Sequence, residues 1–151
     1  MAQDNTGKNK MWYTGEVQHE GFPLQLRFPE KPDFDSLQAK YPKLLTVTHT
    51  FDKVKPSGMP EADYNESLAD FDHEMITAFE QSSSGLTILV ETFGGRRNYY
   101  MYISASAPLE DVKKHFTSKY PQHQLNWDIR DDQGWKFIRR YSEEYKFYKK
   151  T

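Results

Sequence analysis

The fold is decided by residues 86–104, which read LTILVETFGGRRNYYMYIS. Two strand-like segments, 86–93 and 97–104, flank the pair Gly94-Gly95. Two glycines between such segments are typical of a tight hairpin turn, because that turn needs positive φ angles. We therefore predict two antiparallel strands here.

A helix is predicted on each side of this hairpin. Pro60 suits a first helical position, and apolar residues then recur at spacings of four, three, four and four. They are Tyr64, Leu68, Phe71, Met75 and Phe79. This period predicts one amphipathic helix of about five turns over residues 60–80. Pro108 begins the second helix, and Tyr120-Pro121 ends it.

Further strands, at 43–51 and 124–130, complete the order β-α-β-β-α-β between residues 43 and 130. This is the order of the ferredoxin-like split βαβ core, in which both helices cover one face of a four-stranded antiparallel sheet. An N-terminal β-hairpin at 11–28, a short helix at 34–40 and a C-terminal helix at 135–148 are added to this core. The predicted class is α+β.

Length and composition limit the function classes. A chain of 151 residues is one ordinary domain, so we expect a flexible tail at residues 1–10 and a single α+β domain over 11–151. The absence of cysteine excludes disulfides, zinc–cysteine sites and thiol catalysis. Neither a signal-peptide pattern nor an apolar run of about 20 residues is present. We expect a cytoplasmic protein with no membrane partner.

Several short motifs occur in a characteristic order. They are Trp12-Tyr13, Gly21-Phe22-Pro23-Leu24 with Arg27, Tyr41-Pro42, Gly58-Met59-Pro60, Leu68 with Phe71, the segment from Arg96 to Tyr102, and Trp135. In this order they resemble the bacterial family called domain of unknown function 695, over residues 11–141. That family is similar in turn to the regulator-B family of ribonuclease E activity, small acidic α+β proteins that bind and inhibit an enzyme. By analogy, the resemblance implies a protein-binding role.

The predicted helix at 60–80 carries carboxylates and no Lys or Arg. Asp63, Glu66, Asp70 and Glu74 fall on one stripe, opposite the apolar stripe. Repeated like charges at i,i+4 cost an isolated helix a few tenths of a kcal/mol each. The stripe is therefore a candidate docking surface for a protein with a basic surface. The alternative is the solvated back of a helix.

The sheet face offers a second candidate site. Tyr100 and Tyr102 share one face of their strand, and Glu91 and Arg97 are expected near them. An open face with these groups suits a small-molecule binder, an enzyme, or a platform on which single-stranded RNA stacks. Alternatively, the two rings pack against Trp12 or Tyr13 of the N-terminal hairpin.

The sequence does not favour nucleic acid as a partner. The net charge is −2, whereas affinity for a phosphate backbone needs clustered Lys and Arg. The third strand also departs from the RNA-recognition signature, because Asn98 takes the place of its glycine, and Met101 and Ser104 take the places of aromatics.

Metal and cofactor signals are weak. Asp70-x-x-His73 with Glu74 is half of a carboxylate–histidine motif, whereas bundle metal sites need two inward-facing motifs. The five histidines lack the spacing of a metal site. We expect His49, on the apolar side of its strand, to be hydrogen-bonded, and we expect no metal or cofactor.

Opposite charges gather in two parts of the chain. Residues 136–151 carry a net +4 and residues 60–80 carry −7, which indicates contact within one molecule or head-to-tail association. Tyr141, Tyr145 and Tyr148 share a helical stripe that suits either a homodimer patch or packing on the domain's own sheet.

The function expected from the sequence is a non-catalytic protein-binding or regulatory module that presents the acidic helix face. Two alternatives stay open: a small-molecule binder or enzyme at the open sheet face, and a single-stranded RNA binder.

Overall fold

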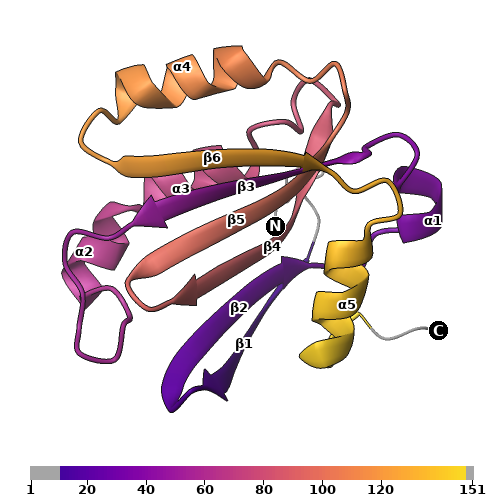
Figure 1. Cartoon of the computed structure of the whole chain (residues 1–151). Helices are drawn as coiled ribbons and strands as arrows, with labels where there is room; N and C mark the ends of the chain where they lie inside the picture. The colour runs from indigo at the N-terminus through magenta and orange to yellow at the C-terminus, as the bar shows by residue number, and fades with distance from the viewer. Residues whose placement is uncertain (1–10, 149–151) are drawn as a thin grey trace.

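The computed structural model describes residues 11–148. They form a six-stranded antiparallel sheet in the order β1-β2-β4-β5-β3-β6 (Figure 1). The strands are β1 (Trp12–His19), β2 (Phe22–Pro29), β3 (Lys43–Thr50), β4 (Gly85–Phe93), β5 (Arg96–Ile103) and β6 (Gln124–Asp131). The helices are α1 (Phe34–Leu37), α2 (Ala62–Ser67), α3 (Ala69–Ile76), α4 (Leu109–Lys119) and α5 (Lys136–Glu144). The α+β class and all six strands are confirmed; the predicted tail at 1–10 lies outside the described residues.

The central hairpin forms as the sequence predicts. β4 pairs with β5 from Gly85↔Ile103 to Phe93↔Arg96, with a bulge between Thr87 and Leu89. Gly94 and Gly95 have φ angles of 60° and 82°, the positive values that a two-residue turn of this kind requires.

Helices cover both faces of the sheet (Figure 1). On one face, α3 and α4 bury a cluster that includes Val47, Phe71, Tyr99 and Phe116. On the other face, α1 and α5 bury a second cluster that includes Phe34, Tyr102, Trp135 and Ile138. Because successive side chains of a strand point to opposite faces, β5 contributes Tyr99 to one cluster and Tyr102 to the other. Within residues 11–148, no helix has the length and apolar character that a membrane crossing requires.

The single helix predicted at 60–80 is wrong in its extent. The chain forms two short helices with a break at Leu68, which has φ −90° and ψ 0°. The Ser67 hydroxyl donates to the Tyr64 carbonyl oxygen at 2.5 Å. In a continuous helix this oxygen would accept from the Leu68 amide, and such competition by a side chain interrupts helices. The apolar period is nevertheless confirmed, since Leu68, Phe71, Met75 and Phe79 are all buried.

The terminal helix is also shorter than the predicted 135–148. Trp135 precedes α5 with a left-handed backbone, φ 54°, and Tyr145 and Tyr148 follow the helix. Trp135 is fully buried, stacks on Tyr102 with ring centroids 4.2 Å apart, and donates its indole N–H to the Tyr41 carbonyl at 2.8 Å. This contact fixes α5 on the sheet.

Gly85 generates a test of the β4–β5 packing. A Cβ at this position would lie 2.6 Å from the Tyr102 carbonyl oxygen and 2.7 Å from Ile103 Cγ2. We expect Gly85→Ala to lower the free energy of unfolding by about 1–3 kcal/mol, the usual cost of overpacking. Gly15→Ala is the matched control because a Cβ there meets nothing within 4 Å. Urea unfolding compares the two variants, and equal stability would contradict the close packing.

Candidate functional site

The acidic stripe predicted on one helix is divided by the break at Leu68. Asp63 and Glu66 lie on α2, and Asp70 lies at the start of α3. All three are exposed, and none forms a side-chain hydrogen bond or an ion pair with another residue of the described range. We call these three carboxylates the acidic face.

Glu74 is not part of this face, which corrects the predicted four-residue stripe. Its half-buried carboxylate joins α3 to α4: Lys119 Nζ donates to it at 2.7 Å, His115 Nε2 lies 2.8 Å from it, and the Tyr120 hydroxyl also donates to it. Burial raises the pKa of Glu74, but these three hydrogen bonds outweigh burial and lower the pKa to about 2. Glu74 therefore stabilises the contact between two helices.

The motif Asp70-x-x-His73 with Glu74 does not assemble a metal site. Across residues 11–148, no group of three or more His, Cys, Asp or Glu side chains is placed to hold a metal ion.

Two of the four predicted sheet-face residues, Glu91 and Tyr100, come into contact, but their face is covered, and the Tyr102 hydroxyl donates to Asp132 instead. Glu91 accepts hydrogen bonds from Asn98 Nδ2 at 2.7 Å, from the Tyr100 hydroxyl at 3.2 Å and from the Tyr141 hydroxyl at 2.6 Å. Burial, together with the charge of Glu91, raises the pKa values of Tyr100 and Tyr141. Both phenols therefore stay protonated: Tyr100 donates to Glu91 within the sheet, and Tyr141 donates to it from α5 and so attaches that helix to the sheet.

The aromatic partners of this face are not those predicted. Tyr100 lies against Phe137 of α5 with ring centroids 4.6 Å apart, and Tyr102 stacks on Trp135. Tyr13 instead stacks on Phe28 of its own hairpin. The alternative of packing against Trp12 or Tyr13 is therefore wrong, because the C-terminal helix occupies the position expected for the N-terminal hairpin.

Arg97 lies on the opposite face from the other three residues. Its Nε donates to Thr92 Oγ1 at 2.8 Å, and a terminal nitrogen donates to Asn65 Oδ1 at 3.0 Å. The strand alternation places it there, since Arg97 is an odd number of residues from Tyr100 and Tyr102. The predicted cluster of Glu91, Arg97, Tyr100 and Tyr102 does not form.

Arg97 faces a charged network that sequence reasoning missed. Asp72 accepts a bidentate pair of hydrogen bonds from Arg27 at 2.7 and 2.9 Å and a bond from the Tyr99 hydroxyl at 2.7 Å, and Arg97 lies 3.8 Å away. Burial opposes ionisation of Asp72, but the Arg27 contacts outweigh it and lower its pKa. The one sequence signal was that Asp72 lies off the acidic stripe, next to the buried Phe71.

His49 is buried without the expected hydrogen bond. Neither ring nitrogen has a partner among residues 11–148, and the imidazole stacks on His123 with ring centroids 4.9 Å apart. Burial, followed by the nearby His123 and Arg97, lowers the pKa of His49 to about 4. The prediction of a hydrogen-bonded histidine is wrong.

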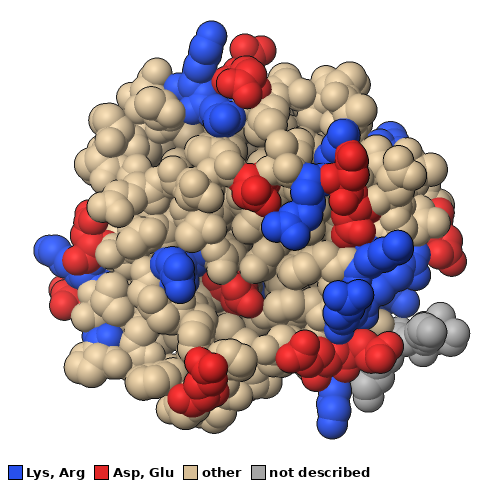
Figure 2. Space-filling view, in the orientation of Figure 1, with Lys and Arg blue, Asp and Glu red and all other residues tan. Residues whose placement is uncertain are grey.

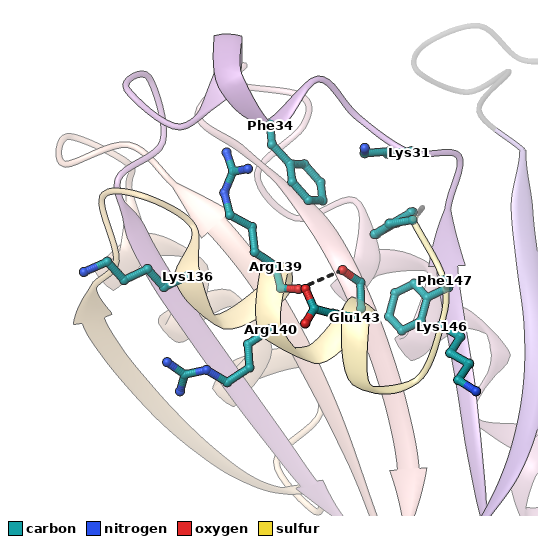
Figure 3. Close-up of a pocket in the computed structure, with 10 residues that line it drawn as sticks. Lys31, Phe34, Lys136, Arg139, Arg140, Glu143, Lys146 and Phe147 are labelled. Atoms are coloured by element: carbon teal, nitrogen blue, oxygen red, sulfur yellow. Dashed lines mark hydrogen bonds between the residues drawn. The ribbon is translucent and has the colours of Figure 1, made fainter. Parts of the chain in front are cut away.

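A cleft of about 750 Å³ lies between α1 and α5 (Figure 3). We call it the α1–α5 cleft. Five of its lining residues are cations and one is a carboxylate: Lys31, Lys136, Arg139, Arg140 and Lys146, with Glu143. The rings of Phe34, Phe147 and Tyr148 line it as well. Figure 2 shows Lys and Arg side chains gathered over α5. Sequence analysis detected the basic segment but not the cleft.

The tyrosines of the C-terminal segment contact the chain's own sheet. Tyr141 binds Glu91, and the Tyr148 hydroxyl donates to the Pro29 carbonyl at 2.7 Å. Burial raises the pKa of Tyr148. Of the two uses predicted for these residues, packing on the sheet is the one observed for Tyr141 and Tyr148.

His49 generates a prediction on pH. Its pKa is about 4 in the folded state, against an ordinary value of 6.5, so the unfolded chain takes up a proton first as the pH falls. The free energy of unfolding should then decrease between pH 6.5 and pH 4, by on the order of 3 kcal/mol in total. We expect His49→Leu to flatten this part of a urea-unfolding profile, and the exposed His73→Gln to leave it unchanged. A profile with the same slope in both variants would show that His49 is not the group responsible.

Asp72 generates a second prediction, on stability. Asp72→Asn leaves Arg27 and Arg97 without their counter-charge, and breaking a buried ion pair costs about 3–5 kcal/mol. We expect a loss of about 2–3 kcal/mol, since the Arg27 side chain is 25% exposed. Asp70→Asn is the control, because that carboxylate is exposed and unpaired within the described part of the chain. Chemical denaturation measures both; a loss no larger than in the control would contradict a stabilising role for the network.

Comparison with known proteins identifies a family, but no individual curated protein or solved structure. A family model described as a family of unknown function, DUF695, matches residues 10–141, in agreement with the resemblance over 11–141. No curated protein and no solved structure matches the chain. Because the matched span covers well over half of the sequence, the chain belongs to the DUF695 family of unknown function.

Proposed function

We propose that this protein is a non-catalytic protein-binding or regulatory module that presents the acidic face to a partner with a basic surface. The observation that carries the proposal is that Asp63, Glu66 and Asp70 are exposed and have no side-chain partner within residues 11–148. Neighbouring carboxylates without counter-charges repel one another, and a cationic partner would relieve that repulsion and be attracted to the face over a distance.

The engagement of the sheet-face groups argues against a binding or catalytic site at that face. Glu91 and Tyr100 are hydrogen-bonded to each other and covered by α5, and Tyr102 is fully buried. The alternatives of a small-molecule site, an enzyme or an RNA platform at this face would each require α5 to leave the sheet.

The topology supports a finer proposal on fold. We infer that β3, β4, β5 and β6, with α3 and α4, form the ferredoxin-like split βαβ unit. Along the chain, the first to fourth strands of such a unit correspond to β3, β4, β5 and β6. In space, the unit places its second strand beside the third, the third beside the first and the first beside the fourth, and the sheet has this order, β4-β5-β3-β6. A cytoplasmic, bacterial protein related to the regulator-B family of ribonuclease E activity is part of the same proposal.

Neutralising the acidic face tests the function. We expect Asp63→Asn/Glu66→Gln/Asp70→Asn to slow partner association about tenfold or more at low salt, because steering by charge acts on the association rate. Affinity capture with chemical crosslinking identifies the partner and its contact site, and surface plasmon resonance measures the rates.

The matched control is Glu16→Gln/Glu20→Gln/Asp111→Asn, which also removes three exposed negative charges. Crosslinks that avoid α2 and α3, or equal association rates for the two triple variants, would contradict the proposal.

A further inference from the structure

We propose that the α1–α5 cleft binds an acidic segment of a partner protein, which inserts one bulky apolar side chain among the aromatic rings of the cleft. The cleft is built by α1 and α5, whereas the acidic face belongs to α2 and α3 on the other side of the sheet. The proposal is therefore independent of the function proposed above.

The first argument is the unpaired charge of the cleft. Lys136, Arg140 and Lys146 are exposed and form no ion pair with any residue between 11 and 148. Elsewhere many cations are paired with carboxylates of the chain itself, as Arg27 is with Asp72 and Lys119 with Glu74. The positive charge of these three residues is thus available to an external anion.

The second argument is the position of these charges on α5. Lys136 and Arg139 lie in its first turn and Arg140 follows directly, while the first turn holds no acidic residue. The N-terminus of a helix carries a partial positive charge, so cations there oppose helix formation. The Asp132 carboxylate accepts the backbone N–H groups of Lys136 and Phe137 at 2.9 and 3.0 Å and so supplies the negative charge that this end of the helix favours. The cations themselves add nothing to helix stability, and choices that conflict with local stability are expected at functional sites.

The third argument is the spacing of the cations, which favours an extended chain over a single small anion. α5 has nine residues and so extends about 13 Å; Lys136 is its first residue, and Lys146 lies two residues beyond its last. Figure 3 shows Lys136, Arg140 and Lys146 pointing outward in different directions, not toward one point. Residues i, i+2 and i+4 of an extended peptide span roughly 13 Å, so alternate acidic side chains can reach both ends of this row.

The aromatic part of the cleft suits an apolar anchor. Phe34 and Phe147 are 7% and 9% exposed, and the Tyr148 ring lies 5.7 Å from Phe34 and 4.9 Å from Phe147. Arg139 lies over the Phe34 ring at 5.2 Å, held there by Asp35 and Gln38. A cleft of about 750 Å³ falls within the range of ligand pockets.

A protein segment fits this surface better than RNA does. Asp35 and Glu143 interrupt the cations, and a uniform phosphate backbone would face both carboxylates. A peptide can place neutral side chains opposite them and acidic ones opposite the cations.

A peptide selection tests the proposal with the full-length protein. We expect a random 12-residue phage library to yield peptides that combine several Asp or Glu with one bulky apolar residue. Fluorescence polarisation should show about tenfold or greater weakening by Lys136→Gln/Arg140→Gln/Lys146→Gln. The matched control Lys53→Gln/Lys55→Gln/Lys114→Gln, which removes three exposed lysines elsewhere, should bind within about twofold of the wild type.

Three further measurements complete the test. Amide NMR shifts on peptide binding should map to residues 34 and 136–147, and replacing the apolar residue of the peptide by Ala should weaken binding. Neutralising Asp63, Glu66 and Asp70 should leave peptide binding intact, so that failure here and failure of the acidic-face proposal are distinguishable. Selected peptides without acidic character, shifts away from the cleft, or tighter cleft binding by a single-stranded RNA oligonucleotide would each overturn the proposal. Self-association lost in the cleft variant would also overturn it, by making a second copy the occupant.

Discussion

The contact between Trp135 and the sheet determines how the rest of the molecule can be used. The indole stacks on Tyr102 and donates to the Tyr41 carbonyl, so the residues on either side of it are fixed in place. A left-handed residue at this point costs backbone energy that the surrounding contacts must offset. Because Trp135 is held on the sheet, α5 covers Tyr100 and Glu91, and this aromatic face of the sheet becomes part of the hydrophobic core beneath α1 and α5.

The same contact creates the cleft between α1 and α5. Because one face of α5 is committed to the sheet, its remaining residues must line the groove beside Phe34 or face solvent. The basic side chains of the segment after Trp135 are thereby placed along the cleft. On the other side of the sheet, Asp72 and Glu74 are bound by cations of the chain itself, which leaves only part of the acidic helix pair free.

Local chemistry made most of the fold predictable, and tertiary contacts account for what was missed. Alternation and the Gly94-Gly95 turn locate the strands because both depend on neighbouring residues alone. The apolar period found the buried face of residues 60–80 but not the break, since one hydroxyl, that of Ser67, decides which donor the Tyr64 carbonyl receives.

The candidate site was harder to predict, because partners in it are distant in sequence. Nothing near Asp72 indicates that Arg27 of β2 will face it, and nothing near Glu74 indicates α4. For Arg97 the information was present: strand alternation separates it from Tyr100.

Glu91 carries a consequence for how this family can diverge. Its carboxylate receives donors from Asn98, Tyr100 and Tyr141, on two different elements. An apolar side chain at position 91 would leave three covered donors without their acceptor, which lowers stability. In related sequences, a substitution at position 91 should therefore occur together with substitutions at its tyrosine neighbours, positions 100 and 141.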